Sequence, residues 1–337
     1  YIDALSFDRG YGSYRQLLEG ELTGRAGNFV APQGNPAGRA GILPGQEGGT
    51  AGAPGDLAAP QDFVPRQIYK LRQFTNQKVT EPLWHDQQSE TYEADITNKL
   101  VPDYSDIDFS RYPRVCDDKN PMHRIWNDGA WIKAYLAHGC YWHKCAFCDT
   151  QLDYVCGYKT VDAEALYCGL LDTARSKGVY GIHFVDEALP PAALKTFALL
   201  NAQNGNPLYF WGNIRFEKSF TKDLAAFLSY CGFGGASAGL EVATGEGLKA
   251  INKGTSIETV VGACAALKEA GVLVHAYMIY GFWHDTPQSI INSMETLRQF
   301  FAAGLLDSSF WHKFTLTRNS KVYSEWTKEM HPELIPI

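Results

Sequence analysis

The stretch WIKAYLAHGCYWHKCAFCD, residues 131–149, joins an apolar segment of strand length to a loop with three cysteines. Alternating segments continue after it. We expect strands at 131–138, 181–186, 208–215, 234–241, 272–280 and 308–316, and helices at 162–177, 191–204, 221–230, 257–270 and 287–303. Six strands that alternate with helices predict an α/β fold with a parallel sheet, either open and doubly wound or a complete or partial barrel.

Polar residues follow the predicted carboxyl ends of these strands. The cysteines follow the first strand, Asp186 and Glu187 the second, Arg215 the third, Glu241 the fourth and residues 281–285 the fifth. Open sheets and barrels of this class both place active sites at that end. The sequence therefore predicts one site there, although each polar residue could separately be a helix cap or a buried structural group.

The rest of the chain predicts smaller parts around this barrel. Residues 1–22 have the pattern of one βα unit, residues 23–60 are a Gly-, Ala- and Pro-rich linker, and residues 61–130 form an irregular connecting segment. Residues 131–316 contain the alternating strands and helices, and residues 317–337 begin a C-terminal extension. Because the chain starts at Tyr1 within an apolar run, we expect it to begin inside a longer protein.

The composition narrows the class of protein. The 337 residues are 45% apolar and 20% charged, with a net charge of -7, which argues against a broad nucleic-acid-binding face. No apolar run approaches the roughly 18 to 20 residues that cross a bilayer, and no signal peptide opens the chain. We expect a cytoplasmic protein without a membrane partner.

Cys140, Cys145 and Cys148 are three of the eight cysteines and lie within nine residues. A closed zinc site needs four ligands, and either His143 or His138 could complete one. A four-cysteine iron–sulfur site would need a fourth thiolate, for which Cys156 is the one nearby candidate. Three thiolates on a four-iron cluster would instead leave one iron open to a substrate or cofactor.

The loop GCYWHKCAFCD, residues 139–149, resembles the cluster loop of the radical SAM superfamily, especially the group with an N-terminal cobalamin (B12)-binding domain. Four residues separate its first two cysteines, where three are commonest. Residues 183–187, 239–241 with 248–254, and 277–286 are similar to further motifs of the family. The resemblance implies a partial (β/α)6 TIM-like barrel with parallel strands, in which residues 1–22 are the remnant of a Rossmann-like domain.

The resemblance also implies cofactors and their ligands. The three cysteines would hold a [4Fe-4S] cluster whose open iron binds S-adenosylmethionine. Asp186 or Glu187 would accept a hydrogen bond from the ammonium group of SAM, and Arg215 or Lys253 would pair with the carboxylate of SAM. The remaining implied contacts are Glu241 for the ribose, the backbone near Ile279 and Gly281 for adenine, and Phe147 packed against cluster and adenine.

The activity that the resemblance implies is reductive cleavage of SAM to a 5'-deoxyadenosyl radical, which acts on an unactivated carbon of a small molecule or peptide. Flavodoxin or ferredoxin would donate the electron. Cobalamin is left open, because no Asp-x-His-x-x-Gly motif occurs in the chain; with cobalamin we expect methyl transfer, and without it rearrangement, cyclisation or oxidation. Two alternatives stand beside this enzyme: a zinc-binding interaction module and a non-catalytic iron–sulfur protein.

Aromatic residues are predicted near the mouth of the barrel. Part of this set is expected in the core, and those at the rim would suit an apolar or planar substrate, or the face of a corrin ring. The residues are Trp142, Tyr154, Trp211, Trp283 and Trp311.

Overall fold

The computed structural model describes residues 4–6, 28–30, 39–41, 67–70, 84–85, 95–112, 114, 119 and 130–334. The chain divides into two compact units, Tyr1–Thr97 and Asn98–Ile337. Each unit is considered by itself.

The first unit holds short antiparallel strands. β1 (Ala4–Ser6) pairs with β4 (Gln67–Lys70), which pairs with β5 (Trp84–His85), while β2 (Asn28–Val30) pairs with β3 (Arg39–Gly41). The strand of the βα unit predicted at residues 1–22 is present as β1, and the helix of that unit lies outside the described residues. The domain boundaries, including the Rossmann-like remnant and the linker, stay predictions.

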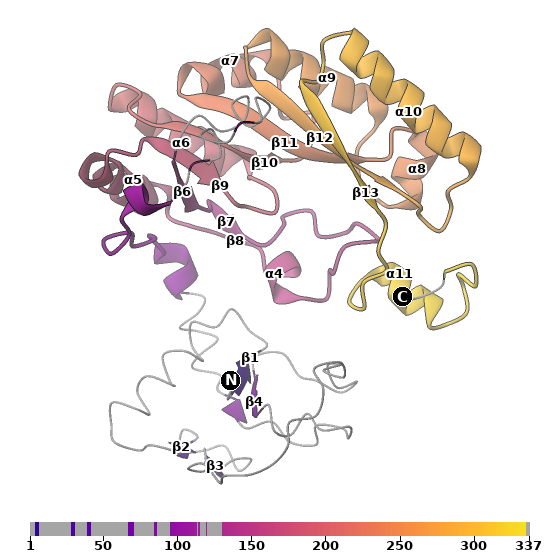
Figure 1. Ribbon diagram of the computed structural model, residues 1–337, viewed down its shortest axis with the longest axis horizontal. Coiled ribbons are helices and arrows are strands. Elements are labelled where there is room, and N and C mark those ends of the chain that lie inside the picture. Colours follow the sequence, from indigo (N-terminus) through magenta and orange to yellow (C-terminus); the bar gives the residue numbers. More distant parts are fainter. Residues whose placement is uncertain are drawn as a thin grey trace. The chain divides into compact units, whose positions relative to one another are not determined.

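The second unit is built on a six-stranded parallel sheet in the order β13-β12-β11-β10-β9-β6 (Figure 1). The strands are β6 (Trp131–Ala134), β9 (Gly181–Phe184), β10 (Tyr209–Ile214), β11 (Phe233–Glu241), β12 (Leu273–Tyr280) and β13 (Ser308–Lys313). Within the described residues β6 and β13 pair on one side only, so the sheet is an open partial barrel. The predicted α/β fold is confirmed.

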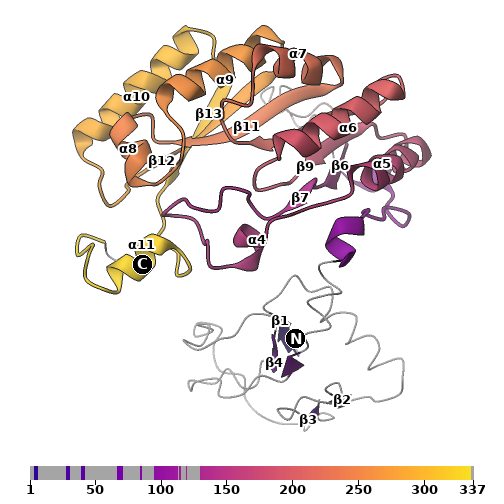
Figure 2. The ribbon, with the colours of Figure 1, turned by 180° about the vertical axis from the view of Figure 1, so that it is seen from behind.

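Five helices cover one face of this sheet, as Figures 1 and 2 show from opposite sides. They are α5 (Ala163–Lys177), α6 (Pro191–Gln203), α7 (Lys222–Tyr230), α9 (Ile257–Glu269) and α10 (Pro287–Ala302). The strand residues that face them, such as Ile182, Phe184 and Phe210, are at most 1% exposed. This continuous apolar layer is the core, and burying it drives the layers together.

Local sequence signals fix where these helices begin and end. The side chains of Asp162, Thr221 and Thr286 accept hydrogen bonds from the first-turn amides of α5, α7 and α10. Gly178 ends α5 with a φ of 67°, which suits a residue without a Cβ. Three shorter helices, α4 (Asp153–Cys156), α8 (Gly245–Ala250) and α11 (Lys321–Trp326), were not predicted.

The strand predicted at 131–138 is divided in two. β6 ends at Ala134, and β7 (Ala137–His138) pairs antiparallel with β8 (Lys159–Thr160). The Asp186 carboxylate accepts from the backbone amides of Leu136 at 3.0 Å and Ala137 at 2.8 Å. Because this side chain takes the place of a neighbouring strand, the parallel ladder stops before these residues.

No helix in the described part of the chain combines the length and apolar composition that spanning a bilayer requires.

Candidate functional site

A cavity of about 270 Å³ lies at the carboxyl ends of the central strands. All three predicted metal ligands, Cys140, Cys145 and Cys148, line it. The cavity is also lined by further predicted site residues, namely Phe147, Glu187, Arg215, Glu241, Lys253 and Ile279. The structure thus brings together side chains that are up to 139 positions apart, from Cys140 to Ile279. Asp186 and Gly281 are not among the residues that line the cavity.

The cysteine loop reaches the cavity through a series of tight turns. Gly139 and His143 have positive φ angles of 71° and 35°. The amide of Cys140 donates to Val155 O at 2.8 Å, the ring of His143 bonds to Cys140 O at 2.9 Å, and the amide of Cys148 donates to Cys145 O at 3.3 Å. A loop has no regular backbone hydrogen-bond ladder, so these bonds fix its conformation. In that conformation all three thiols line the same cavity.

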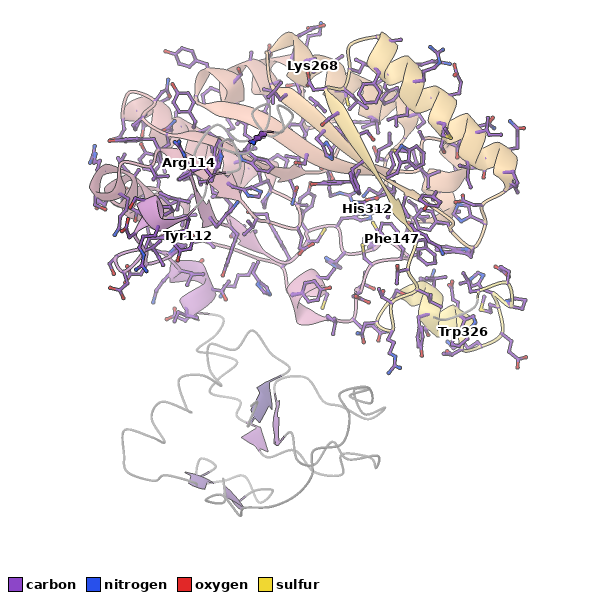
Figure 3. The ribbon with its side chains drawn as sticks, in the orientation of Figure 1. Tyr112, Arg114, Phe147, Lys268, His312 and Trp326 are labelled. Carbon is purple, nitrogen blue, oxygen red and sulfur yellow. The ribbon has the colours of Figure 1, made fainter. Side chains whose placement is uncertain are left out.

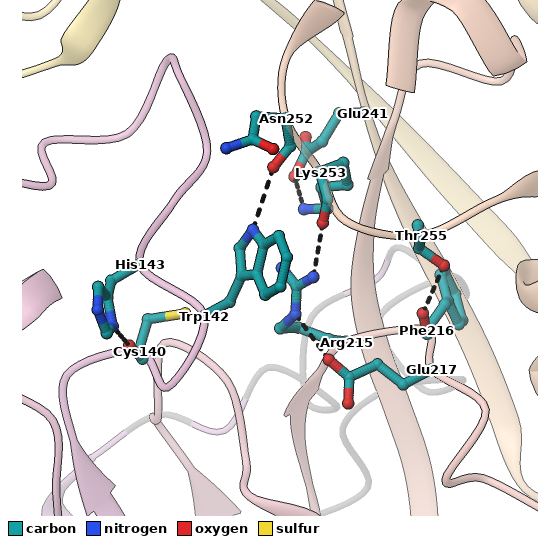
Figure 4. A network of polar contacts seen from close by, with 10 residues as sticks. All are labelled: Cys140, Trp142, His143, Arg215, Phe216, Glu217, Glu241, Asn252, Lys253 and Thr255. Carbon is teal, nitrogen blue, oxygen red and sulfur yellow. Dashed lines mark hydrogen bonds and ion pairs between the residues drawn. The ribbon is translucent and has the colours of Figure 1, made fainter. Parts of the chain in front are cut away.

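The loop docks on the turn that follows α8. The indole of Trp142 donates a hydrogen bond to Asn252 O at 3.1 Å (Figure 4). The amide of Ala146 donates to Ile251 O at 2.9 Å, and the Asn252 side chain donates to Lys144 O at 2.7 Å. The sequence predictions missed these contacts. The similarity of residues 248–254 to a family motif was the available signal, but it did not show that the turn supports the loop.

A second support comes from the segment after β13. The amide of Val322 donates to Ala146 O at 3.0 Å, and the amide of Asn319 donates to the Asp149 carboxylate at 3.2 Å. The cysteine loop is therefore held between two segments that lie more than 100 residues beyond it in the sequence.

The charges in the cavity are paired. Lys253 Nζ lies 2.8 Å from Glu241 Oε1, Arg215 Nε lies 2.9 Å from Glu217 Oε1, and Arg215 Nη2 donates to Lys253 O at 2.6 Å (Figure 4). The side chains of Arg215, Lys253 and Glu241 are only 7%, 10% and 11% exposed. Buried charges require such partners. Burial by itself lowers the pKa of Lys253. The negative charges of Glu241 and Cys145 outweigh this effect, so the pKa of Lys253 is raised overall.

The thiols respond to this positive surrounding. A hydrogen bond with Cys148, together with the charges of Lys253 and Arg215, lowers the pKa of Cys145 to about 6 against the opposing effect of burial. The same hydrogen bond and burial raise the pKa of Cys148. Since a thiolate is the metal-binding form of cysteine, the loop already favours one ligand at neutral pH.

Of the two predicted acidic residues after β9, only Glu187 lines the cavity. Asp186 is 2% exposed and its carboxylate accepts from Leu136 and Ala137. Burial raises the pKa of Asp186 to about 7, although these backbone donors oppose the rise. The prediction left the choice open, and the geometry favours Glu187 as the residue that meets a ligand.

An aromatic cluster adjoins the cavity. Phe147 packs against Phe282 with ring centroids 5.5 Å apart, and Ile279, Trp283 and Phe314 surround them. Gly281 has a φ of 85° and donates its amide to the Asp285 carboxylate at 2.8 Å. That amide is already used, so a backbone contact to a ligand in the cavity is better assigned to Ile279 than to Gly281.

In the segments that the structure describes, no group of three His, Cys, Asp or Glu side chains already surrounds a point that could hold a metal ion. His143 lines the cavity beside the cysteines, whereas His138 and Cys156 are not among the lining residues. Cys156 is exposed. The features that would suit a metal are the three thiols and the His143 ring, all of which line the same cavity.

The open six-stranded parallel barrel, with its cavity at the carboxyl ends, is the fold of the radical SAM enzymes. The chain is similar to the radical SAM methyltransferase TsrM from Kitasatospora setae, solved with cobalamin and a [4Fe-4S] cluster, with a TM-score of 0.53 and 17% identity over 60% of this chain and 37% of that chain. TsrM with tryptophan substrate and the SAM analogue aza-SAM gives a TM-score of 0.53 at 17% identity, covering 62% and 40%.

The cobalamin-dependent radical enzyme OxsB shows a weaker likeness, with a TM-score of 0.46 and 14% identity over 63% of this chain and 31% of that chain. No protein-family model and no curated protein sequence matches the chain. The chain spans 37 to 40% of the length of the TsrM chains. At these identities the likeness establishes the fold.

Proposed function

We propose that the chain is the core of a radical SAM enzyme. The observation that carries this proposal is the cavity itself, because three thiols from one short loop and a set of buried, paired charges converge there. Its place at the carboxyl ends of parallel strands is where such folds bind ligands.

The donor set fits a [4Fe-4S] cluster. Cys140, Cys145 and Cys148 would hold it, and the charges of Lys253 and Arg215 would offset the negative charge of the thiolates. With SAM bound, such a cluster supplies reductive cleavage of the C5'–S bond and a 5'-deoxyadenosyl radical. The protein's part is to position the groups and exclude water, for which Phe147 and its aromatic neighbours are placed.

The lining residues also fit the polar groups of SAM. Glu187 would accept from the ammonium group, Arg215 or Lys253 would pair with the carboxylate, and Glu241 would accept from the ribose hydroxyls. Ile279 would lie along the adenine. Because Glu217 and Glu241 already balance the two cations, the zwitterionic amino-acid part of SAM can enter the cavity without leaving those side chains unpaired.

The proposal for the reaction covers its substrate class, its electron donor and its type. We propose a small-molecule or peptide substrate, flavodoxin or ferredoxin as electron donor, and either cobalamin-dependent methyl transfer or rearrangement. The methyl transfer is supported by the likeness to TsrM, whose structure holds cobalamin. A cytoplasmic location is supported by the cysteines, since all seven in the described residues are free thiols.

The first test is anaerobic reconstitution of the chain with iron and sulfide, followed by reduction with dithionite in the presence of SAM. We expect cluster absorbance at about 400 nm and release of 5'-deoxyadenosine, which is measured by chromatography. Cys145→Ala should lose both signals. Cys168→Ala is the matched control, because this thiol is exposed on α5 and does not line the cavity.

One observation favours a second candidate, a zinc-binding module: His143 lines the same cavity as the three cysteines. That candidate predicts a colourless protein with one zinc and no cleavage of SAM. A brown protein that leaves SAM intact would instead identify a non-catalytic iron–sulfur protein.

A further inference from the structure

The face of the sheet opposite the helices is lined with rings and nitrogen donors. On one side of it, Lys133, His183 and Trp211 occupy the same register position on β6, β9 and β10. Lys133 Nζ contacts His183 Nδ1, and the imidazole of His183 stacks on the indole of Trp211, with ring centroids 3.7 Å apart and planes within 6°. This row is a stack of two rings with an ammonium group at its end.

The other side of the same face carries a similar set on β12 and β13. The rings of His275 and Tyr277 lie 4.6 Å apart, and Tyr277 lies 5.9 Å from His312, which Figure 3 labels. Between the two sides, the central strand β11 contributes only small residues in register, among them Gly235 and Ser237.

This face continues into the cavity. Asn213 is two residues beyond Trp211, and Tyr277 is two residues beyond His275; both line the cavity. Residues two apart on a strand share a face and lie about 7 Å apart. Asn213 therefore lies one such step, about 7 Å, beyond the row of Lys133 along the strands, and two strand spacings, about 10 Å, from β6 across the sheet.

The charges at the Lys133 end of this face favour an anion. The strands contribute one lysine and three histidines, and the carboxylates lie at the cavity end, where Glu187 follows β9 and the Glu241 carboxylate turns back over Gly239. Among the described residues no ion pair joins Lys133 to an acidic side chain. Burial lowers the pKa of His183 to about 4, and burial also lowers the pKa values of His275 and Lys133. The buried Nε1 of Trp211 has no acceptor in the described part of the chain.

We infer that this face binds a planar molecule that carries a carboxylate or phosphate group. The anionic group lies at Lys133, the planar part lies along His183 and Trp211, and the opposite end reaches the cavity at Asn213. An ammonium group that no described carboxylate pairs with is stabilised by an anion, and the neighbouring rings favour a flat apolar body. The inference rests on the proposed function in assigning a substrate class to that same site.

The test is isothermal titration of the full chain, without cluster or SAM, with four probes. We expect 2-naphthoate or 2-naphthyl phosphate to bind at least about tenfold more tightly than 2-naphthylmethylamine, which has the same rings and a positive charge, and than cyclohexanecarboxylate, which has the charge without the rings. The tighter of the two anions identifies the acidic group. Equal affinities for the anionic and cationic naphthalenes, or no binding of either anion, would overturn the inference.

Two variants locate the binding. Lys133→Met should weaken binding of the anionic naphthalene about tenfold, whereas Lys222→Met, which removes an exposed lysine on α7, should not. His183→Ala, which removes the ring beside Lys133, should also weaken it and covers the case in which the first variant fails to fold. If these two variants bind like Lys222→Met, the inference is wrong. A chain that cleaves SAM but does not bind the anions would refute this inference alone, and the reverse result would refute the proposed function alone.

Discussion

Glu241 has an unusual backbone conformation for a charged residue. It ends β11 with a φ of 65°, next to a register shift between Gly239 and Glu241. Its carboxylate turns back over Gly239 and binds Lys253 at 2.8 Å. A non-glycine residue in the left-handed region costs about 1 kcal/mol or more, and such strain gathers at functional sites. Here the conformation brings a carboxylate to the cavity.

Gly239→Ala tests this arrangement. An added Cβ would lie 1.9 Å from Glu241 Oε1 and 2.9 Å from Lys253 Nζ, so the buried ion pair must move. We expect the free energy of unfolding in urea to fall by about 2 kcal/mol. Gly234→Ala, on the same strand with no atom within 4 Å of its added Cβ, is the control and should change it little. Equal stabilities of the two variants would contradict the close contact.

The sequence predicted the identities of the site residues better than their orientations. Asp186 and Glu187 are adjacent, and either carboxylate suits a cationic ligand. The choice between them depends on two amides at Leu136 and Ala137, about 50 positions earlier in the chain, which bind one carboxylate. No pattern within residues 183–187 contains that information.

At the scale of elements, the cysteine loop depends on its neighbours. It has no helix or ladder of its own across residues 139–149 and is held by the turn after α8 and by the segment around Val322. The indole of Trp142 packs on Gly254, whose φ is 74° and whose added Cβ would lie 2.1 Å from the ring. Only glycine allows the ring to lie so close.

Gly254→Ala should displace the loop. The positive φ costs about 1 kcal/mol for alanine, and the collision with a ring costs about 1 to 3 kcal/mol more. We expect a lower midpoint of thermal unfolding and less iron bound per chain after anaerobic reconstitution, measured by a colorimetric iron assay. Gly262→Ala on α9 is the matched control, because its added Cβ meets nothing within 4 Å and alanine favours a helix. Unchanged iron binding in Gly254→Ala would show that this contact does not support the loop.

The strands and long helices of the barrel were predicted to within a few residues, because their apolar periodicity depends on the residues nearby. The errors arose where distant or local chemistry overrides periodicity. β6 stops at Ala134 because Asp186 binds the amides that follow, and α8 was missed because Gly245 and Gly247 are poor helix formers. The place of α11 beside the cysteine loop depends on contacts with no sequence signal.

At the scale of the whole molecule, the cavity is assembled from distant parts of the chain. Its lining residues come from the cysteine loop, α4, the segment after β9, the ends of β10, β11 and β12, and the turn after α8. An unfolded chain holds the three thiols near one another but has none of the paired charges around them. Binding of a cluster is therefore coupled to folding, and the folded state should gain stability from it.

Thermal unfolding measures this coupling. After anaerobic reconstitution with iron and sulfide, we expect the melting temperature to rise by about 5 °C, which corresponds to about 2 kcal/mol for a barrel of this size. Cys148→Ser should abolish the rise, since its thiol lines the cavity and is a proposed ligand. Cys156→Ser, at an exposed thiol outside the cavity, should retain it. The same rise in both variants would mean that iron binds elsewhere, and loss of the rise in Cys156→Ser would make that thiol a fourth ligand and leave no open iron for SAM.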